Sequence, residues 1–290
     1  MSELTTIDTN NYAAMAKAMG IANEGGNKQK ASTLARLRIQ HSPILGDDKV
    51  LVKAGQYKME IPDGETYYAS SVKVRPYMQR FMYKRFVKGS GNVPNRYVKT
   101  VMADTLTIDL KDNDGGFNCG KPAGYIQDFQ GLPKNTQELI RQIKRVRVVL
   151  GTVELIGATD SNGNEVNVPE TAFIWEIENR DAFKEVGNVF AKLNKMKRLP
   201  VQHIITANTD ERKLPNGNSF FLPMVSLDVT NTVEVTQEDQ DKFSDFMSWV
   251  SNYNEYIINA YAEKASPHND EDDAAITDGM IDIELEEEVA

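Results

Sequence analysis

Hydrophobic and polar residues alternate along much of the chain after residue 33, and turn-forming residues separate the alternating runs. In residues 34–40, Leu37 and Ile39 alternate with Arg36 and Arg38. A period of two places every second side chain on one face of a β-strand, so these runs predict strands. We expect further strands within residues 49–62, 66–103, 105–111, 144–157, 166–178, 201–208 and 219–231.

A spacing of three to four residues between hydrophobic positions predicts two longer helices. The first covers residues 181–198 and ends before Pro200. The second begins after Thr236, a good capping residue, and continues to about Ala265. Its hydrophobic stripe comprises Phe243, Phe246, Met247, Val250, Tyr253, Ile257 and Tyr261. A short helix is also expected over residues 10–19, followed by a flexible basic linker.

These patterns predict a mainly β protein with flanking helices, of the α+β class. We divide it into an N-terminal helical arm and basic linker (1–33), a core with a C-terminal helix (34–266) and a disordered acidic tail (267–290). The tail contains ten acidic residues and no Lys or Arg. Because the whole chain has a formal charge of −9, the rest of it carries +1. The net negative charge of the chain is therefore concentrated in the acidic tail.

The stretch from Thr66 to Ala103 combines eight Lys or Arg residues with seven Tyr or Phe residues and has no acidic residue. Cations suit phosphates and flat rings suit unpaired bases, so this mixture favours single-stranded nucleic acid. Within it, Phe81, Tyr83 and Arg85 would share one strand face. Arg80, Met82, Lys84, Phe86 and Lys88 would share the other. The alternative is an amphipathic hairpin whose rings belong to the core and whose cations are solvated.

Candidate catalytic and metal-binding chemistry is weak. Residues 115–121 have the spacing of a phosphate-binding loop, but Pro122 stands where that loop needs Ser or Thr. Asp104, Asp109, Asp112 and Asp114 suggest a metal nuclease only faintly. One cysteine and three histidines exclude an internal disulfide and make a zinc site improbable. We therefore expect no enzymatic activity and no cofactor.

No run of eighteen apolar residues occurs, so we expect no membrane span. The N-terminus shows no basic segment followed by an apolar one, so no secretory signal is expected. Both features favour a cytoplasmic location.

Several of these features together resemble the single-stranded DNA-binding, or helix-destabilising, proteins of tailed bacteriophages, especially the T-even type. They are the arm NYAAMAKAMG, the basic segment KQKAST at residues 28–33, the aromatic-basic body and the acidic tail. The resemblance implies an OB-fold-like barrel, self-association through the arm and a host-cell cytoplasmic location. It also implies that the tail recruits replication proteins such as a polymerase, primase or helicase. Two departures are the absent Cys/His zinc site and a tail that ends Glu288-Val289-Ala290.

We therefore predict a non-catalytic protein that coats single-stranded DNA. The expected nucleic-acid contacts are Lys73, Arg75, Tyr77, Arg80, Phe81, Tyr83, Lys84, Arg85, Phe86, Lys88, Arg96, Tyr97, Lys99, Arg145 and Arg147. The expected partner-binding tail residues are Ile281, Asp282, Ile283, Glu284, Leu285 and Glu286. The alternatives are a structural or protein-interaction protein without nucleic-acid binding and, more weakly, a nucleotide- or metal-dependent DNA enzyme.

Overall fold

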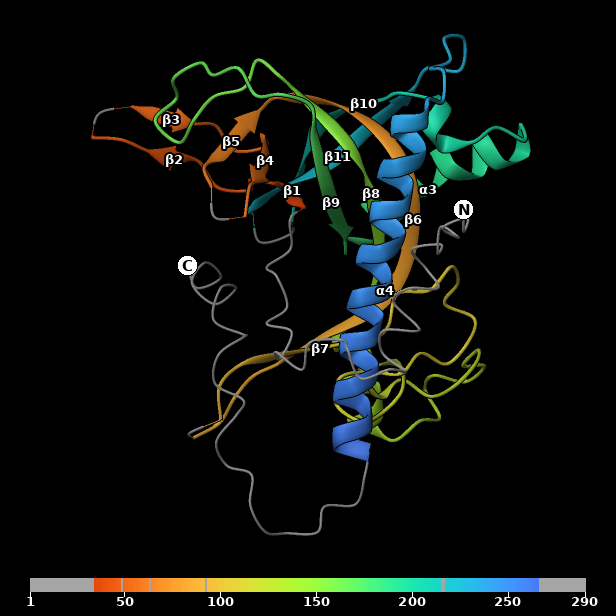
Figure 1. The fold of residues 1–290 in the computed structure, drawn as a ribbon. Coiled ribbons are helices and arrows are strands. Elements are labelled where there is room, and N and C mark those ends of the chain that lie inside the picture. The colour runs from red at the N-terminus through yellow and green to blue at the C-terminus, as the bar shows by residue number, and fades with distance from the viewer. Residues whose placement is uncertain (1–33, 48, 63, 92, 215–216, 266–290) are drawn as a thin grey trace, which may run out of the picture. The chain divides into compact units, whose positions relative to one another are not determined.

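A computed structural model describes residues 34–47, 49–62, 64–91, 93–214 and 217–265 (Figure 1). The chain divides into two units, Met1–Thr33 and Leu34–Ala290, and every described residue belongs to the second. The expected arm and the expected tail contacts lie outside the described residues, as does the acidic segment 266–290.

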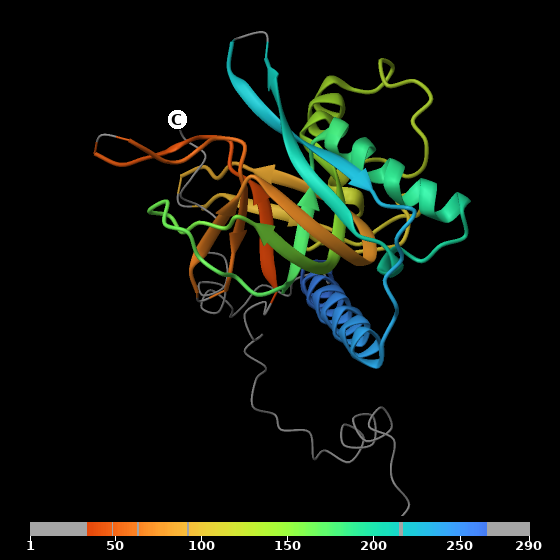
Figure 2. The same ribbon diagram turned by 90° about the horizontal axis from the view of Figure 1, so that it is seen from above.

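One large mixed sheet forms the centre of the second unit, and helices and loops surround it (Figures 1 and 2). Its strands are β1 (Ala35–Ile39), β4 (Tyr57–Glu60), β5 (Thr66–Ala69), β6 (Ser71–Val87), β7 (Arg96–Lys99), β8 (Ile143–Ile156), β9 (Thr171–Ile177), β10 (Ile205–Lys213) and β11 (Ser219–Leu227). β2 (Ile44–Leu45) and β3 (Val50–Val52) form a separate pair. The helices are α2 (Lys134–Gln142), α3 (Arg180–Lys195) and α4 (Gln237–Ala265), with 3₁₀ turns η1 (Asn118–Gly120) and η2 (Pro200–Gln202).

The strands of the large sheet follow the order β11-β10-β6-β8-β9-β1-β4-β5, and β7 pairs with β6 off this path. All neighbours are antiparallel except β1 and β9. The expected strand over residues 105–111 does not form as a named strand, and only isolated bridges such as Lys111–Phe117 occur there. The prediction of a mainly β protein with a long C-terminal helix is confirmed.

The β5 end of the strand path comes back toward strands in the interior of the same path. β5 and β6 are separated by Ser70 alone, yet β5 lies at the end of the path and β6 in its middle. Tyr68 of β5 also bridges to Thr159, just beyond β8, through two backbone hydrogen bonds of 2.8 Å. The sheet is therefore strongly curled but open, and the expected OB-like barrel is not confirmed.

Strand β6 bends where it crosses β8. The register shifts between Pro76 and Met78, which inserts an extra residue into β6. Gly151 of β8 lies opposite, and a Cβ there would come within 2.2 Å of the Arg75 carbonyl oxygen. Only glycine permits this close approach. Because of the bulge, Tyr77 and Met78 both join the same hydrophobic cluster.

Two helices cover opposite faces of the sheet (Figure 2). α3 packs Val186, Phe190 and Leu193 into the larger cluster, which also contains Trp175 of β9. α4 packs Phe246 and Val250 onto the other face. The hydrophobic stripes predicted both helices, and Phe246, Val250 and Ile257 of the α4 stripe are buried as expected for the core. Phe243 and Met247 of the same stripe remain exposed.

A buried carboxylate fastens the start of α4 to β6. Asp239 accepts hydrogen bonds from the Thr236 backbone N–H (2.8 Å), the Tyr77 hydroxyl and both terminal nitrogens of Arg75 (2.8 and 3.0 Å). The Asp239 backbone N–H donates in turn to Thr236 Oγ1 at 3.3 Å, which completes a capping box. Burial alone would raise the pKa of Asp239, but the hydrogen bonds from Thr236, Tyr77 and Arg75 outweigh it and lower that pKa.

We expect Asp239→Asn to lower the free energy of unfolding at pH 7 by about 3 kcal/mol, because it leaves the half-buried Arg75 without its charged partner. A carboxyl with a lowered pKa stabilises the fold fully above its unfolded pKa of about 3.9 and less as the pH falls below it. The difference between wild type and variant, measured by urea unfolding, should therefore narrow between about pH 5 and pH 2.

The exposed Asp241 of the same helix supplies the control. Asp241→Asn should change the unfolding free energy little, both at pH 7 and at about pH 2. A wild-type advantage over Asp239→Asn that stays constant down to about pH 2 would contradict the assigned pKa.

Candidate nucleic-acid interface

Several residues expected to contact nucleic acid belong instead to the core. Tyr77 and Tyr83 are 6% and 4% exposed. Tyr77 packs edge-on against Phe246 at 5.4 Å, and the Tyr83 hydroxyl donates to the Leu106 carbonyl at 3.3 Å. Neither ring can stack on a base without opening the core, so both are corrected to structural residues. The stretch 66–103 is thus partly the amphipathic core element that the alternative interpretation described.

Arg147 is also structural, because its guanidinium lies in a cage of rings between the sheet and α3. Its Cζ is 4.4 Å from the centre of the Phe183 ring and 4.9 Å from that of Phe81. Its nitrogens donate to the Gln79 side chain and to the Phe183 carbonyl. Burial lowers the pKa of Arg147 to about 10. A Cβ on Gly187 of α3 would lie 2.4 Å from this guanidinium, so the helix approaches through a glycine.

Some of the remaining predicted cations are bound to other side chains or carbonyls, and others are exposed to solvent. Arg75 bonds Asp239, Arg96 bonds Asp114, and Lys73 lies 3.3 Å from Glu154. Arg80 bonds the Gln79 carbonyl and the Met247 sulfur. The half-buried Arg85 has a buried Nε without a hydrogen-bond partner among the described residues, while Lys88 and Arg145 are exposed. Phe81 lies half-buried, 5.9 Å from Phe183.

Three lysines lie side by side across the sheet on its α4 face. Lys144 of β8 pairs in register with Lys84 of β6, and Lys84 pairs with Lys99 of β7. Paired residues share a face, and like charges directly opposite one another destabilise a sheet. This lysine row therefore concentrates positive charge at an energetic cost.

Carboxylates of β9 and the loop after it compensate the central lysine. The Lys84 ammonium lies 3.3 Å from Glu176 and 2.9 Å from Glu178. Burial would raise the pKa of Glu176, but Lys99, Lys84 and Arg36 together lower it to about 2. Glu176 is therefore ionised at neutral pH and can pair with the Lys84 ammonium.

An aromatic pair adjoins the lysine row. Phe86 and Tyr97 are paired in register on β6 and β7, with ring centres 5.2 Å apart and planes inclined at 58°. Lys84 Nζ lies 4.5 Å from the Tyr97 ring centre and Lys99 Nζ lies 5.7 Å from it. Phe86 is 42% exposed, so part of its ring faces solvent. The lysine row and the Phe86–Tyr97 ring pair are thus in contact on this face of the sheet.

The same face continues over β1 and β4. In the strand register, Arg36 lies opposite Ile174 of the α4-side cluster on one side and opposite Glu60 on the other. Arg38 lies opposite Lys58. We define the basic band as these cations, the lysine row, the ring pair and their carboxylates. Its members are Arg36, Arg38, Lys58, Lys84, Lys99, Lys144, Phe86, Tyr97, Glu60, Glu176 and Glu178. Six cations and three carboxylates give these residues a net formal charge of +3.

The sequence prediction included Lys84, Phe86, Tyr97 and Lys99 of this band but missed Arg36, Arg38, Lys58 and Lys144. The signal for the two arginines was present, because both alternate with hydrophobic residues in residues 34–40. Lys58 and Lys144 belong to strands far apart in the sequence. Only the pairing of β1, β4, β8 and β6 with their neighbours brings these cations to one face.

The loop with phosphate-binding spacing is filled by its own carboxylate. Asp112 is buried and accepts hydrogen bonds from the backbone N–H groups of Asp114, Gly116 and Cys119 at 2.9–3.0 Å. Lys121 donates to the carbonyls of Pro122 and Gly124. The N–H groups that would cradle a phosphate are therefore already used, and the described chain continues from the loop without entering an α-helix until Lys134.

Among the described residues, no group of three His, Cys, Asp or Glu side chains could hold a metal ion. Within the same residues, no helix has the length and apolar character needed to cross a membrane. Comparison of the chain with protein-family models, curated proteins and solved structures found no significant match.

We expect Lys84→Met to raise the pKa of Glu176 part of the way from about 2 toward its ordinary value of about 4.3, because Lys99 and Arg36 remain nearby. The loss of the shared ammonium should also reduce the free energy of unfolding by about 1–3 kcal/mol. NMR titration of the glutamate side-chain carboxyls measures the first effect and urea unfolding the second. A Glu176 pKa unchanged by the substitution would contradict the assigned coupling.

Proposed function

We propose that this protein binds single-stranded DNA through the basic band without catalysing a reaction. The observation that carries the proposal is the lysine row of Lys144, Lys84 and Lys99 beside the partly exposed Phe86 ring. Neighbouring strands lie about 4.8 Å apart, so the row spans roughly 10 Å across the sheet. Phosphates of a strand crossing this face would meet the Lys144 and Lys99 ammonium groups, and a base would stack on Phe86. Lys84, which the sequence analysis also expected to contact nucleic acid, is buried and held by Glu176 and Glu178, so it supports the row from below.

The wider architecture is consistent with the same proposal. The sheet is open but strongly curled, with its β5 end bridged to the segment after β8, and curled antiparallel strands are also the building material of oligonucleotide-binding barrels. We further propose that the protein is of the phage helix-destabilising type, in which residues 1–33 mediate self-association and residues 281–286 recruit replication proteins. These two roles rest on the resemblance of the sequence to that family.

A second candidate function is a structural or protein-interaction role without nucleic acid. The burial of Tyr77, Tyr83 and Arg147 favours it, because part of the aromatic-basic stretch serves the core. The exposed Phe243 and Met247 on α4, 45% and 41% accessible, would suit a protein partner. The two candidates differ in whether the lysine row binds single-stranded DNA.

The direct test is fluorescence anisotropy of labelled oligo-dT and of a duplex of the same length, both titrated with the full chain. The proposal expects tighter binding of oligo-dT, because duplex bases cannot stack on Phe86. Binding to neither DNA would contradict the proposal and favour the structural candidate.

The salt dependence of binding should reveal the phosphate contacts. Log K should fall linearly with log salt by about 0.7 per neutralised phosphate on a single strand. Lys144 is exposed, so Lys144→Gln should flatten this slope by about 0.7 without unfolding the protein. The exposed Lys192 on α3, the opposite side of the sheet, provides the control in Lys192→Gln. Equal slopes for all three proteins would exclude Lys144 from the interface.

Removing the exposed ring should reduce affinity while sparing stability. A stacked base contributes about 1–3 kcal/mol, so Phe86→Ala should weaken oligo-dT binding roughly tenfold. Because Phe86 is 42% exposed, the melting temperature should change little. Tyr125, 90% exposed in a loop outside the band, gives the matched control Tyr125→Ala. If both alanine variants bind like wild type, Phe86 is not a stacking surface.

A further inference from the structure

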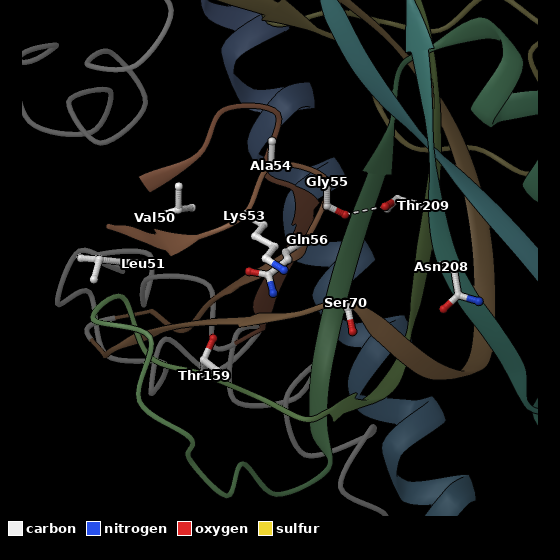
Figure 3. A pocket seen from close by; sticks show the side chains of 10 residues that line it. All are labelled: Val50, Leu51, Lys53, Ala54, Gly55, Gln56, Ser70, Thr159, Asn208 and Thr209. Atoms are coloured by element: carbon white, nitrogen blue, oxygen red, sulfur yellow. Dashed lines mark hydrogen bonds between the residues drawn. The ribbon is translucent and has the colours of Figure 1, made fainter. Parts of the chain in front are cut away.

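A base that binds beyond Phe86 needs another aromatic ring on which to stack. A hollow of about 500 Å³ between β3, the start of β4 and β10 offers none, because its described lining has one cation, Lys53, and no ring (Figure 3). The Gly55 carbonyl in its wall already accepts from Thr209 Oγ1 at 2.5 Å (Figure 3). Rings beside the basic band occur instead on the helix α4.

Three aromatic residues lie along one flank of α4. Trp249, Tyr253 and Tyr256 follow one another at spacings of four and three residues, which makes them neighbours on a helix surface. The rings of Trp249 and Tyr253 are stacked, with centres 6.0 Å apart and planes inclined at 12°. Trp249 is partly exposed and Tyr256 is 38% exposed. We call these three residues the aromatic flank.

The contacts of Asn254 show which way the aromatic flank faces. The Asn254 side chain accepts from the Met102 backbone N–H at 2.6 Å and donates to the Met102 carbonyl at 2.9 Å. Met102 adjoins β6 on the side of β7, where Ala103 bridges to Phe81, and β8 pairs with the other side of β6. Five residues separate Asn254 from Trp249, which corresponds to about 140° around a helix. The aromatic flank therefore faces β8 and β9, which carry part of the basic band.

The aromatic flank meets the lysine row at Tyr253. The Tyr253 hydroxyl donates to the Thr100 carbonyl at 3.0 Å and lies 3.4 Å from the Met82 sulfur. Thr100 directly follows Lys99 of the row. Met82 precedes Lys84 by two residues on the same face of β6, a separation of about 7 Å. The stacked rings and the clustered cations are therefore adjacent.

The charges of α4 determine which part of a nucleotide can lie against it. The helix carries six carboxylates and two lysines, so as a whole it repels phosphates. Between Asp245 and Glu255, however, it has no charged residue, and this uncharged stretch contains Trp249 and Tyr253. Phosphates are thus favoured over the lysine row on the sheet, and bases are favoured against the uncharged part of the helix.

We propose that the aromatic flank of α4 is a second stacking surface for the bound single strand. Its phosphates lie over the lysine row while bases turn toward Trp249 and Tyr256, and Phe86 receives a different base of the same strand. This inference rests on the proposed single-stranded DNA binding and adds the direction in which the bases point.

Tryptophan fluorescence tests the proposal at Trp249. The chain has two tryptophans, and Trp175 is 5% exposed in the cluster on the α3 face, where DNA on the band would not reach it. We expect saturating oligo-dT to quench the wild-type tryptophan emission, because a stacked base quenches an indole. Trp249→Phe keeps a ring, so it should still bind oligo-dT but show no quenching. A chain of tetrahydrofuran abasic units with the same phosphates should bind wild type without quenching.

A pair of matched variants tests the exposed end of the flank. Tyr256→Leu removes a 38% exposed ring, and the control Phe243→Leu removes a 45% exposed ring about 140° away around the same helix. We expect Tyr256→Leu to weaken oligo-dT binding about fivefold or more and to leave abasic binding unchanged. Phe243→Leu should leave both affinities unchanged, and melting curves check that both variants are folded.

The outcomes separate this proposal from the proposed function. If oligo-dT binds wild type without quenching its emission, or if folded Tyr256→Leu binds oligo-dT as well as Phe243→Leu does, the α4 proposal fails while the proposed function stands. Equal weakening of oligo-dT and abasic binding by Tyr256→Leu would also overturn the α4 proposal, because the lost contact would not involve a base. A wild-type protein that binds neither oligomer would overturn both proposals.

Discussion

The compensation of positive charge on β6 decides which of its cations serve the fold and which remain available at the surface. The strand carries five cations over its 17 residues and runs beneath two helices. Where α4 begins, Arg75 is held by Asp239 within the cap of the helix. Further along, β8 places Arg147 against β6, where the rings of Phe81 and Phe183 surround it under α3. Cations in covered regions are thus bound by the fold itself, since an uncompensated buried charge is costly.

The lysine row differs because it places three like charges together on the sheet. Glu176 and Glu178 contact its central member at short range, and Lys144 stays exposed at the edge of the row. A net positive face beside an accessible ring has the chemistry that a single strand of DNA requires.

Local patterns predicted the elements well, and long-range pairing explains what they could not predict. The strand β1 was identified by the alternation at Leu37 and Ile39, and the helix α4 by the stripe through Phe246 and Val250. Both elements were predictable because a strand or helix pattern is set by residues close together in the sequence. Alternation also separated the two faces of residues 80–88, with Met82 under α4 and Tyr83 in a different cluster. It could not show that Tyr83 is covered by the loop carrying Leu110 and Cys119, which lies further along the chain. For the same reason the roles of Arg75 and Arg147 were misjudged: their partners come from α4 and α3.

Lysine footprinting by amine acetylation and mass spectrometry, with and without oligo-dT, tests the basic band most directly. We predict that oligo-dT protects Lys144, Lys99 and Lys58 from acetylation. We also predict unchanged reactivity at Lys184 and Lys192, which are exposed on α3 across the sheet. Protection confined to the α3 lysines, or none at all under conditions where oligo-dT is bound, would contradict the assignment of the basic band as the nucleic-acid interface.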